Sequence, residues 1–429
     1  MNHIEARAID WAAWVRAGDR VVCSHMTAEP VTLLRSLATA NPHVGQFHVF
    51  LGVPFSDASA AFAVDTMFTT FGGMGSAGAL ARSHAVQVSM AHYSQCGLAF
   101  ASGGERADVL LVSLARAPDG TLHLGASHGY VLEAARRARC IVAEVNAMAP
   151  VVSGAPWPEG LAIDATIEVA YPLAAAGDAR ISAVERSIAA QVAPLVGQGA
   201  CLQVGIGSLP SAVLDGLADH RALGLHSGML TPALWRLIEC GAIDNSRKPL
   251  DTGISVAGCV YGDAALYAAV HLNPAVALRP PAYTHAAATI ARLAGFTAIN
   301  SALEVDLLGQ MNAETVPARG GARRQVGGVG GLNDFVRGAR HAPQGLAIVA
   351  LPSRHAPRDG TPGAPRIVAT LSGPATVAAS DADVVVTEHG VARLRHATLD
   401  ERARRLIAIA HPDDRAALLA AARRSGQLS

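Results

Sequence analysis

The chain contains 429 residues, and its 34 Lys and Arg residues equal its 34 Asp and Glu residues, so the formal net charge is zero. A balanced charge gives no electrostatic footprint for nucleic acid or for an anionic membrane, and neither is expected as a partner. Lys248 is the only lysine. This argues against pyridoxal-phosphate and other Schiff-base chemistry, because such enzymes need a reactive lysine.

Length and composition predict two domains, since a domain typically holds about 100–200 residues. No stretch approaches the roughly 18 consecutive apolar residues of a membrane span. The first residues lack the pattern of a signal peptide, so we expect a cytoplasmic protein. Six scattered cysteines without a Cys-x-x-Cys pair fit a reducing compartment. The 17 histidines show no metal-ligand spacing, and no metal is expected.

Short apolar strands alternate with amphipathic helices, and this order predicts an α/β fold with mostly parallel sheets. The continuous apolar run at 107–113 is typical of a strand that is covered on both faces. Other strands are predicted at 140–145, 200–204, 345–351 and 383–387. The pattern lapses at 171–178, which predicts an N-terminal domain over 1–178 and a C-terminal domain over 179–429.

Two local features of the second half predict its finer structure. The stretch 399–424 is helical but contains Pro412, which ends one helix and allows acidic residues to begin the next. The stretch 300–312 predicts a hairpin that turns at 308–310.

A first glycine motif, Gly73-x-Gly75-x-x-Gly78, resembles a dinucleotide-binding fingerprint. No clean apolar strand precedes it, and no acidic residue follows at the required spacing of about 20 residues. A glycine loop without a nucleotide is therefore the preferred interpretation, and a nicotinamide-dependent dehydrogenase is disfavoured.

A second motif, Gly205-Ile206-Gly207-Ser208-Leu209, directly follows a predicted strand and precedes a predicted helix. In that position, backbone N–H groups can hold an anion or a carbonyl oxygen. A tight turn between strand and helix explains the glycines equally well, so both interpretations stay open.

The third motif places Gly327, Gly328, Gly330 and Gly331 within five residues. So many glycines cost backbone entropy, which favours a loop that something approaches closely. A bound ligand is the preferred interpretation of this loop.

Carboxylates stand at the ends of several predicted strands: Glu144, Glu304, Asp306 and Glu388. A carboxylate in such a place can act as a nucleophile or as a general base. Each one taken alone is more often a structural hydrogen-bond acceptor.

Taken in order, these segments resemble the acetyl-CoA hydrolase/transferase family, of which 4-hydroxybutyrate CoA-transferase is a member. The resemblance is carried by the stretches 202–207, 225–229, 299–306, 327–335, 350–353, 366–368, 385–391 and 409–412. It implies two similar α/β domains with the active site at their interface. It also implies transfer of CoA between a short acyl-CoA and a small carboxylate, with CoA as a substrate and no separate cofactor. A homodimer is expected from base rates alone.

The resemblance also implies roles for individual residues. Gly205, Ile206, Gly207, Ser208 and Leu209 are expected to line the CoA site. Gly328, Gly330 and Gly331 are expected to form a loop that holds CoA or the tetrahedral oxyanion, since backbone amides stabilise such an oxygen.

The chain departs from the family pattern at the residue that attacks the thioester. The family glutamate corresponds to Gly228 in His226-Ser-Gly-Met229, and glycine has no carboxylate. His285 replaces a family asparagine, Leu332 replaces a glutamine and Leu346 replaces a lysine. These changes together indicate a divergent subgroup.

Three hypotheses follow from the missing glutamate. In the first, the protein is a CoA-transferase in which another carboxylate attacks, with Glu304 as first candidate, Glu388 as second and Asp57 as third. In the second, it is an acyl-CoA hydrolase in which Glu304, Glu388 or His285 activates a water molecule. In the third, it binds CoA thioesters without turnover. The sequence does not identify the acyl group or the acceptor.

Overall fold

The computed structural model describes residues 2–3, 9–177, 180–355 and 363–428. The chain divides into two compact units. Unit 1 contains the chain up to Gly177 together with Gly228–Pro232 and Ile254–Thr284, and unit 2 contains the remainder. The domain boundary predicted at 178/179 falls on residues outside the described part of the chain.

Unit 1 is built on a sheet whose strands run parallel along the order β1-β9-β8-β6-β2-β3-β4-β5. The strands are β1 (Asn2–His3), β2 (Arg20–Cys23), β3 (His48–Gly52), β4 (Met67–Thr70), β5 (Ala85–Val88), β6 (Val109–Arg116), β8 (Cys140–Asn146) and β9 (Ala165–Val169). A short strand, β7 (Leu122–His123), pairs antiparallel with β6. The predicted buried strand at 107–113 is thus the centre of this sheet.

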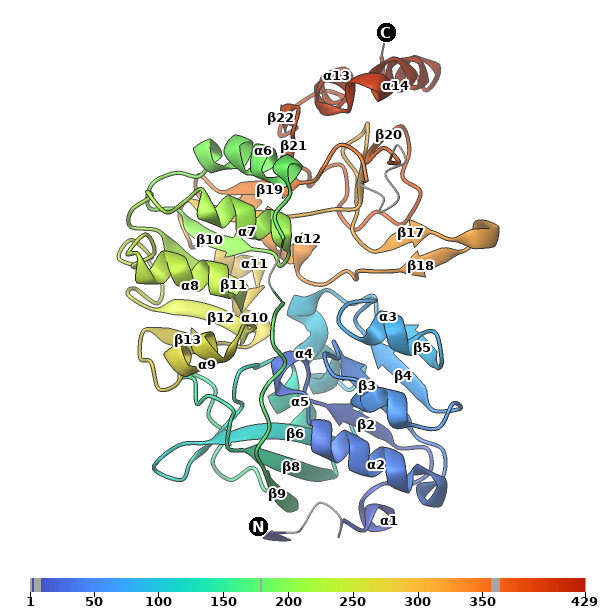
Figure 1. Ribbon diagram of the computed structural model, residues 1–429, viewed down its shortest axis with the longest axis vertical. Coiled ribbons are helices and arrows are strands. Elements are labelled where there is room, and N and C mark those ends of the chain that lie inside the picture. The colour runs from blue at the N-terminus through green and yellow to red at the C-terminus, as the bar shows by residue number, and fades with distance from the viewer. Residues whose placement is uncertain (1, 4–8, 178–179, 356–362, 429) are drawn as a thin grey trace. The chain divides into compact units, whose positions relative to one another are not determined.

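Helices cover both faces of the unit 1 sheet (Figure 1). On one face, α2 (Val31–Val44) buries Leu33, Leu34 and Leu37 in a core that includes Val49 of β3. Because side chains alternate along a strand, the neighbouring Phe50 points to the other face. There its ring lies 5.3–5.4 Å, centroid to centroid, from the rings of Phe71, Phe100 and Tyr130.

The later segments of unit 1 add a parallel pair of strands and two helices. These are β12 (Ser255–Val260), β13 (Val276–Leu278), α9 (Ala264–Val270) and α10 (Pro281–Thr284). The remaining helices of this unit are α1 (Trp11–Trp14), α3 (Ala77–Leu80), α4 (Cys96–Ala101) and α5 (Val131–Ala135).

Unit 2 contains a second, mostly parallel sheet with the strand order β11-β10-β14-β19-β21-β22. The strands are β10 (Cys201–Val204), β11 (Gly224–Leu230), β14 (Phe296–Asn300), β19 (Leu346–Ala350), β21 (Val384–Thr387) and β22 (Gly390–Arg393). Only β22 runs antiparallel to its neighbour. The α/β fold with mostly parallel sheets, predicted from the sequence, is confirmed.

Helices again lie on both faces of this sheet (Figure 1). In α12 (Leu332–His341), Phe335 and Ala339 share a core with Ala347 and Val349 of β19, so the intervening Ile348 points to the other face. The other helices are α6 (Ala183–Val192), α7 (Ser208–Asp215), α8 (Pro232–Glu239), α11 (Ala287–Ile290), α13 (Leu399–Ile409) and α14 (Pro412–Arg424). The predicted interruption at Pro412 is confirmed.

Two small sheets complete unit 2. In the first, β15 (Glu304–Asp306) pairs antiparallel with β16 (Met311–Asn312) and parallel with β20 (Ile367–Val368). The turn between β15 and β16 is the one predicted at 308–310. In the second, β17 (Thr315–Pro317) and β18 (Arg323–Gln325) form a hairpin.

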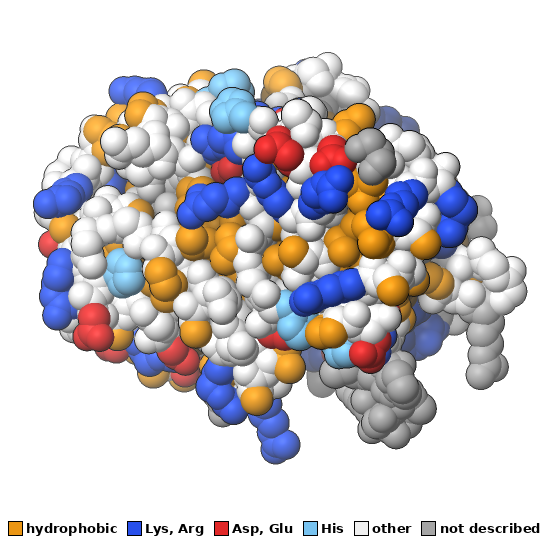
Figure 2. Space-filling model, turned by 90° about the horizontal axis from the view of Figure 1, so that it is seen from above, with side chains coloured by type: hydrophobic (Ala, Val, Ile, Leu, Met, Phe, Trp, Pro, Cys, Tyr) orange, Lys and Arg blue, Asp and Glu red, His pale blue; other side chains and the backbone are white. Residues whose placement is uncertain are grey.

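On the face shown in Figure 2, basic side chains are interspersed with hydrophobic and acidic ones. Among the helices of the described residues, none combines the length and the apolar character that are needed to cross a bilayer.

Candidate functional site

The strand order of unit 2 places a ligand-binding position between β10 and β14. From β10 the chain proceeds outward to β11, whereas from β14 it proceeds the other way to β19 and β21. Ligands of open parallel sheets bind at the carboxyl ends of the strands where this direction reverses. The predicted glycine loop 205–209 directly follows β10 and therefore lies at this reversal.

Local contacts explain each glycine of this loop. The Gly205 N–H donates to the Ile299 carbonyl at 2.9 Å, and a Cβ at Gly205 would lie 3.2 Å from Asn300 Oδ1. Gly207 has a φ of +126°, which disfavours other residues. The Ser208 hydroxyl donates to the Glu185 carboxylate and ties the first turn of α7 to α6.

The side chains of the loop differ in their access to a ligand. Ile206, between the two glycines, is 47% exposed, whereas Leu209 is buried in the core. Because the Gly205 N–H already donates to Ile299, the backbone amides at 206–208 are the groups of this loop that fit an anion or a carbonyl oxygen. Leu209 anchors the loop in the core.

The second glycine loop, 327–331, leads into α12 and is partly explained by packing within unit 2. The Gly327 N–H donates to the Glu314 carbonyl at 2.9 Å, and a Cβ at Gly327 would lie 2.1 Å from the Ala313 carbonyl oxygen. Gly330 has a φ of +52°. A Cβ at Gly331 would lie 2.4 Å from the His285 ring. Protein contacts therefore require glycine at 327 and 331.

The structure brings His285 and Gly331, two of the predicted site residues, into contact. The His285 ring is 3% exposed and lies 4.4 Å from the Phe335 ring, measured between centroids. Burial, with a further effect from His226, lowers the pKa of His285 to about 3. The imidazole is therefore neutral at physiological pH, and it is a weak base.

Glu304, the first candidate for the nucleophile, is 8% exposed and forms an extensive set of hydrogen bonds through Oε1. This oxygen accepts hydrogen bonds from Asn312 Nδ2 at 2.8 Å, from the Ser372 N–H at 2.8 Å, from Ser372 Oγ at 2.9 Å and from the Gly373 N–H at 3.1 Å. The carboxylate thereby fixes the segment at 372–373 to β15.

Glu388, the second candidate, lies in the turn between β21 and β22. Its two oxygens accept from the N–H and the hydroxyl of Ser353, at 2.9 and 2.6 Å. His389 Nε2 is 3.7 Å from Oε1. Burial lowers the pKa of the Arg366 guanidinium, and the nearby charge of Glu388 opposes this effect.

The other carboxylates noted in the sequence have clear structural partners. Asp57 forms an exposed ion pair with Arg35 at 2.8 Å. Asp306 accepts from the backbone of the turn that follows it. Glu144 is buried, accepts from the Thr32 and Leu33 N–H groups at the start of α2 and from the Tyr171 hydroxyl, and burial raises its pKa to about 7.

Sequence reasoning missed two buried polar residues, His25 and Glu29, on the segment that follows β2. His25 Nε2 lies 3.0 Å from the Tyr93 hydroxyl, and burial lowers the pKa of the ring to about 3. Glu29 Oε2 accepts from the N–H groups of Phe55 and Ser56. The sequence feature that could have indicated them is their position: two titratable residues lie between an apolar strand and Pro30, which directly precedes α2.

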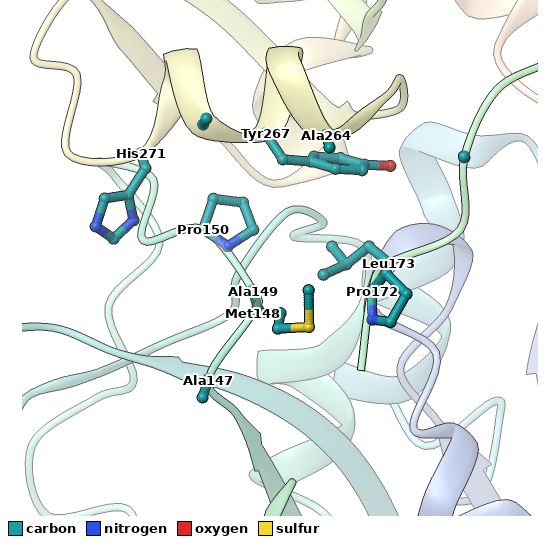
Figure 3. A pocket seen from close by; sticks show the side chains of 11 residues that line it. Ala147, Met148, Ala149, Pro150, Pro172, Leu173, Ala264, Tyr267 and His271 are labelled. Carbon is teal, nitrogen blue, oxygen red and sulfur yellow. The ribbon is translucent and has the colours of Figure 1, made fainter. Parts of the chain in front are cut away.

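A separate cavity of about 480 Å³ lies elsewhere in unit 1. Figure 3 shows Tyr267 of α9 on one side of it and Met148, Pro172 and Leu173 on the other. The Tyr267 hydroxyl donates to the Ala174 carbonyl at 2.5 Å, and His271 Nδ1 accepts from the Val151 N–H at 3.0 Å. No carboxylate is among the described residues that line the cavity, so the cavity does not fit acyl-transfer chemistry.

Comparison with known proteins identifies the family. A model of the acetyl-CoA hydrolase/transferase C-terminal domain matches residues 262–422. The 4-hydroxybutyrate coenzyme A transferase of Clostridium kluyveri is 37% identical over 316 residues, which cover 73% of this chain and 71% of the relative. The chain belongs to the acetyl-CoA hydrolase/transferase family. The resemblance seen in the sequence is therefore confirmed.

Two further similarities concern a solved structure and a hydrolase. The crystal structure of RipA from Yersinia pestis superposes with a TM-score of 0.89 at 29% identity, covering 100% of this chain and 98% of that chain. An acetyl-CoA hydrolase of Saccharomyces cerevisiae is 31% identical over 221 residues, which cover 51% of this chain and 39% of the relative. Among the described residues, no cluster of His, Cys, Asp or Glu fits a metal ion.

Proposed function

We propose that this protein is an acyl-CoA:carboxylate CoA-transferase that moves CoA between a short acyl-CoA and a small carboxylate. The observation that carries the proposal is the 37% identity to a named CoA-transferase over 316 residues. The glycine loop 205–209 at the strand reversal of unit 2 supports it, because that loop offers backbone amides where such sheets bind ligands.

The proposed chemistry uses covalent catalysis. An enzyme carboxylate attacks the acyl-CoA thioester, which forms an acyl anhydride and releases CoA as a thiolate. The thiolate attacks the enzyme carbonyl of the anhydride, so that the first carboxylate leaves and an enzyme–CoA thioester remains. A second carboxylate then receives the CoA. We propose that the loop 205–209 lines the CoA site and binds part of CoA through its amides at 206–208, and that the amides at Gly328, Gly330 and Gly331 hold CoA or the oxyanion. CoA acts here as a substrate, and the scheme needs no other cofactor.

We further propose that Gly228 stands at the position of the family nucleophile, so that another group must attack. Glu304 and Glu388 remain the sequence-based candidates, although each also fixes a loop through its hydrogen bonds. His285 is neutral and lies against Gly331. It can orient a carbonyl oxygen or a water molecule, but its lowered pKa makes it a weak general base.

Hydrolysis is the second candidate function, favoured by the 31% identity to an acetyl-CoA hydrolase. In that case water replaces the acceptor carboxylate. Binding of CoA thioesters without turnover is the third hypothesis. Action in the cytoplasm as a homodimer is also proposed, supported by six free cysteines and by the prevalence of symmetric dimers.

The test is to incubate the protein with acetyl-CoA, with and without acetate, butyrate, succinate, itaconate or 4-hydroxybutyrate, and to follow free CoA and new thioesters. A new thioester that forms only with an acceptor supports transfer. Free CoA released without an acceptor supports hydrolysis. Neither product, together with measurable CoA binding, supports the third hypothesis.

A further inference from the structure

Glu29 occupies the position in unit 1 that corresponds to a ligand site in a parallel sheet. From β2 the chain proceeds outward to β3 and β4, whereas from β6 it proceeds the other way to β8 and β9. The direction in which successive strands are added thus reverses between the parallel strands β2 and β6. Glu29 lies on the segment that follows the carboxyl end of β2. Ligands of such sheets bind at this edge.

The Glu29 carboxylate is held through one oxygen only. Oε2 accepts from the Phe55 N–H at 2.8 Å and from the Ser56 N–H at 2.7 Å. Oε1 is buried and has no hydrogen-bond partner among the residues that the structure describes. Burial raises the pKa of this carboxyl group, so its free oxygen is more basic, and hence more nucleophilic, than that of an exposed glutamate.

A buried carboxylate oxygen without a partner costs free energy, because it has lost its hydrogen bonds to water and gained none within the protein. Glu29 is 5% exposed, so water does not readily remove this cost. The cost is relieved when a ligand supplies a donor or an electrophilic carbon to Oε1. Glu388 differs, since both of its oxygens accept from Ser353. In Glu304, four donors converge on the one oxygen Oε1 and fix it to the segment at 372–373.

Glu29 and Gly228 belong to the same compact unit, and two series of contacts connect them. In the first, the Phe55 ring lies 4.7 Å from the Tyr261 ring, and the Tyr261 N–H donates to the Leu230 carbonyl, two residues after Gly228.

In the second series, Thr27 Oγ1 donates to the Val260 carbonyl at 3.0 Å. A Cβ at Gly258, two residues earlier on the same strand, would lie 3.0 Å from the Gly228 carbonyl oxygen. The segment that carries Glu29 is therefore packed, through β12, against the position where the family glutamate is missing.

We propose that the Glu29 carboxylate is the nucleophile that receives the acyl group in this chain, in the role that Gly228 leaves open. This inference rests on the CoA-transferase function proposed above and names its reacting residue. A carboxylate that is absent at Gly228 within β11 is thus replaced by one on a neighbouring segment of the same unit.

The proposed steps balance without any redox partner. Glu29 Oε1 forms a bond to the thioester carbonyl carbon, the C–S bond breaks, and CoA leaves as a thiolate. The thiolate then attacks the Glu29 carbonyl carbon of the anhydride, which releases the first carboxylate and leaves a glutamyl-CoA thioester. The second carboxylate attacks that thioester, and the released thiolate attacks the new acyl carbon, which restores the Glu29 carboxylate.

The experiment traps the glutamyl-CoA thioester in the full-length protein. Wild-type protein is mixed with acetyl-CoA, reduced with sodium borohydride and digested, and the peptides are analysed by mass spectrometry for the glutamate converted to an alcohol. We expect this product at Glu29. Reaction at any other carboxylate, in a protein that does transfer CoA, overturns the inference and leaves the proposed function intact.

A matched pair of variants provides an independent readout. Glu29→Gln keeps an oxygen that accepts from Phe55 and Ser56, so it should fold, but we expect CoA transfer to fall on the order of 10³-fold or more. Glu133→Gln is the control, because Glu133 lies in the same unit and Oε2 of its side chain also has no partner among the described residues. It should keep the wild-type rate. Full activity in Glu29→Gln overturns the inference.

Turnover in water labelled with oxygen-18 distinguishes a failure of the inference from a failure of the proposed function. If the protein hydrolyses acetyl-CoA through the Glu29–CoA thioester, water attacks the Glu29 carbonyl carbon and CoA leaves, so repeated turnover places the label in the Glu29 peptide. Its absence there, with hydrolysis measured, overturns the inference. A wild-type protein that neither transfers nor hydrolyses overturns the proposed function, and the inference with it.

Discussion

Replacing Glu304 by alanine should destabilise unit 2, because one carboxylate oxygen anchors three residues there. Oε1 accepts from Asn312, from both polar groups of Ser372 and from the Gly373 N–H. A hydrogen bond to a charged group contributes about 1.5–3 kcal/mol. Ser372 and Gly373 are half-buried, so water replaces part of the loss, and Asn312 Nδ2 keeps the Thr315 carbonyl.

These contributions lead us to expect a loss of about 3–5 kcal/mol for Glu304→Ala. In a unit of this size, such a loss lowers the melting temperature by about 8–15 °C. Glu304→Gln keeps an acceptor oxygen and should lose only about 1–2 kcal/mol. Thermal unfolding followed by circular dichroism measures both, and CoA transfer is measured on the folded fraction.

The two roles considered for Glu304 give opposite results. If Glu304 mainly fixes the segment at 372–373, Glu304→Gln unfolds at a slightly lower temperature and keeps most of its transfer activity. The structural reasoning is refuted if Glu304→Gln melts like the wild type but loses activity, or if Glu304→Ala is as stable as the wild type.

Three other changes give measurable outcomes. Gly327→Ala places a Cβ 2.1 Å from the Ala313 carbonyl oxygen and should cost about 1–3 kcal/mol, seen as a lower melting temperature. His285 has a pKa lowered to about 3, so its contribution to the free energy of unfolding is complete above pH ~6.5 and is lost as the pH falls toward 3. In His285→Asn, the free energy of unfolding should therefore fall less steeply over this range, by at most about 1.4 kcal/mol per pH unit, as measured by denaturant unfolding at a series of pH values. Glu144 has a pKa raised to about 7, so its contribution to the free energy of unfolding is largest below pH ~4.5 and is lost as the pH rises through 7. Glu144→Gln should remove this loss of stability, as measured by melting curves at a series of pH values.

The elements that could be predicted from the sequence are those fixed by local patterns. The apolar run at 107–113 overlaps β6 (Val109–Arg116) from residue 109 onward, as expected for a strand that is covered on both faces. Pro412 begins α14 as its first residue, and the hairpin turn at 308–310 follows from the short polar stretch between β15 and β16.

The roles of the carboxylates could not be predicted in the same way, because their partners come from distant parts of the chain. Glu304 meets Ser372, 68 residues later, and Glu388 meets Ser353, 35 residues earlier. Glu29 depends on the N–H groups of Phe55 and Ser56 beyond the next strand. Only the folded chain shows which carboxylate oxygens of the described residues already have donors and which, such as Oε1 of Glu29, have none.

The most direct test of the central claim, CoA transfer, is an exchange measurement with acetyl-CoA and deuterated acetate. The acetyl-CoA pool is analysed by mass spectrometry over time, with heat-denatured protein as the control. CoA transfer predicts that deuterium enters acetyl-CoA while the total thioester concentration stays constant. Loss of the thioester with release of free CoA, and no deuterium in the acetyl-CoA that remains, would contradict it.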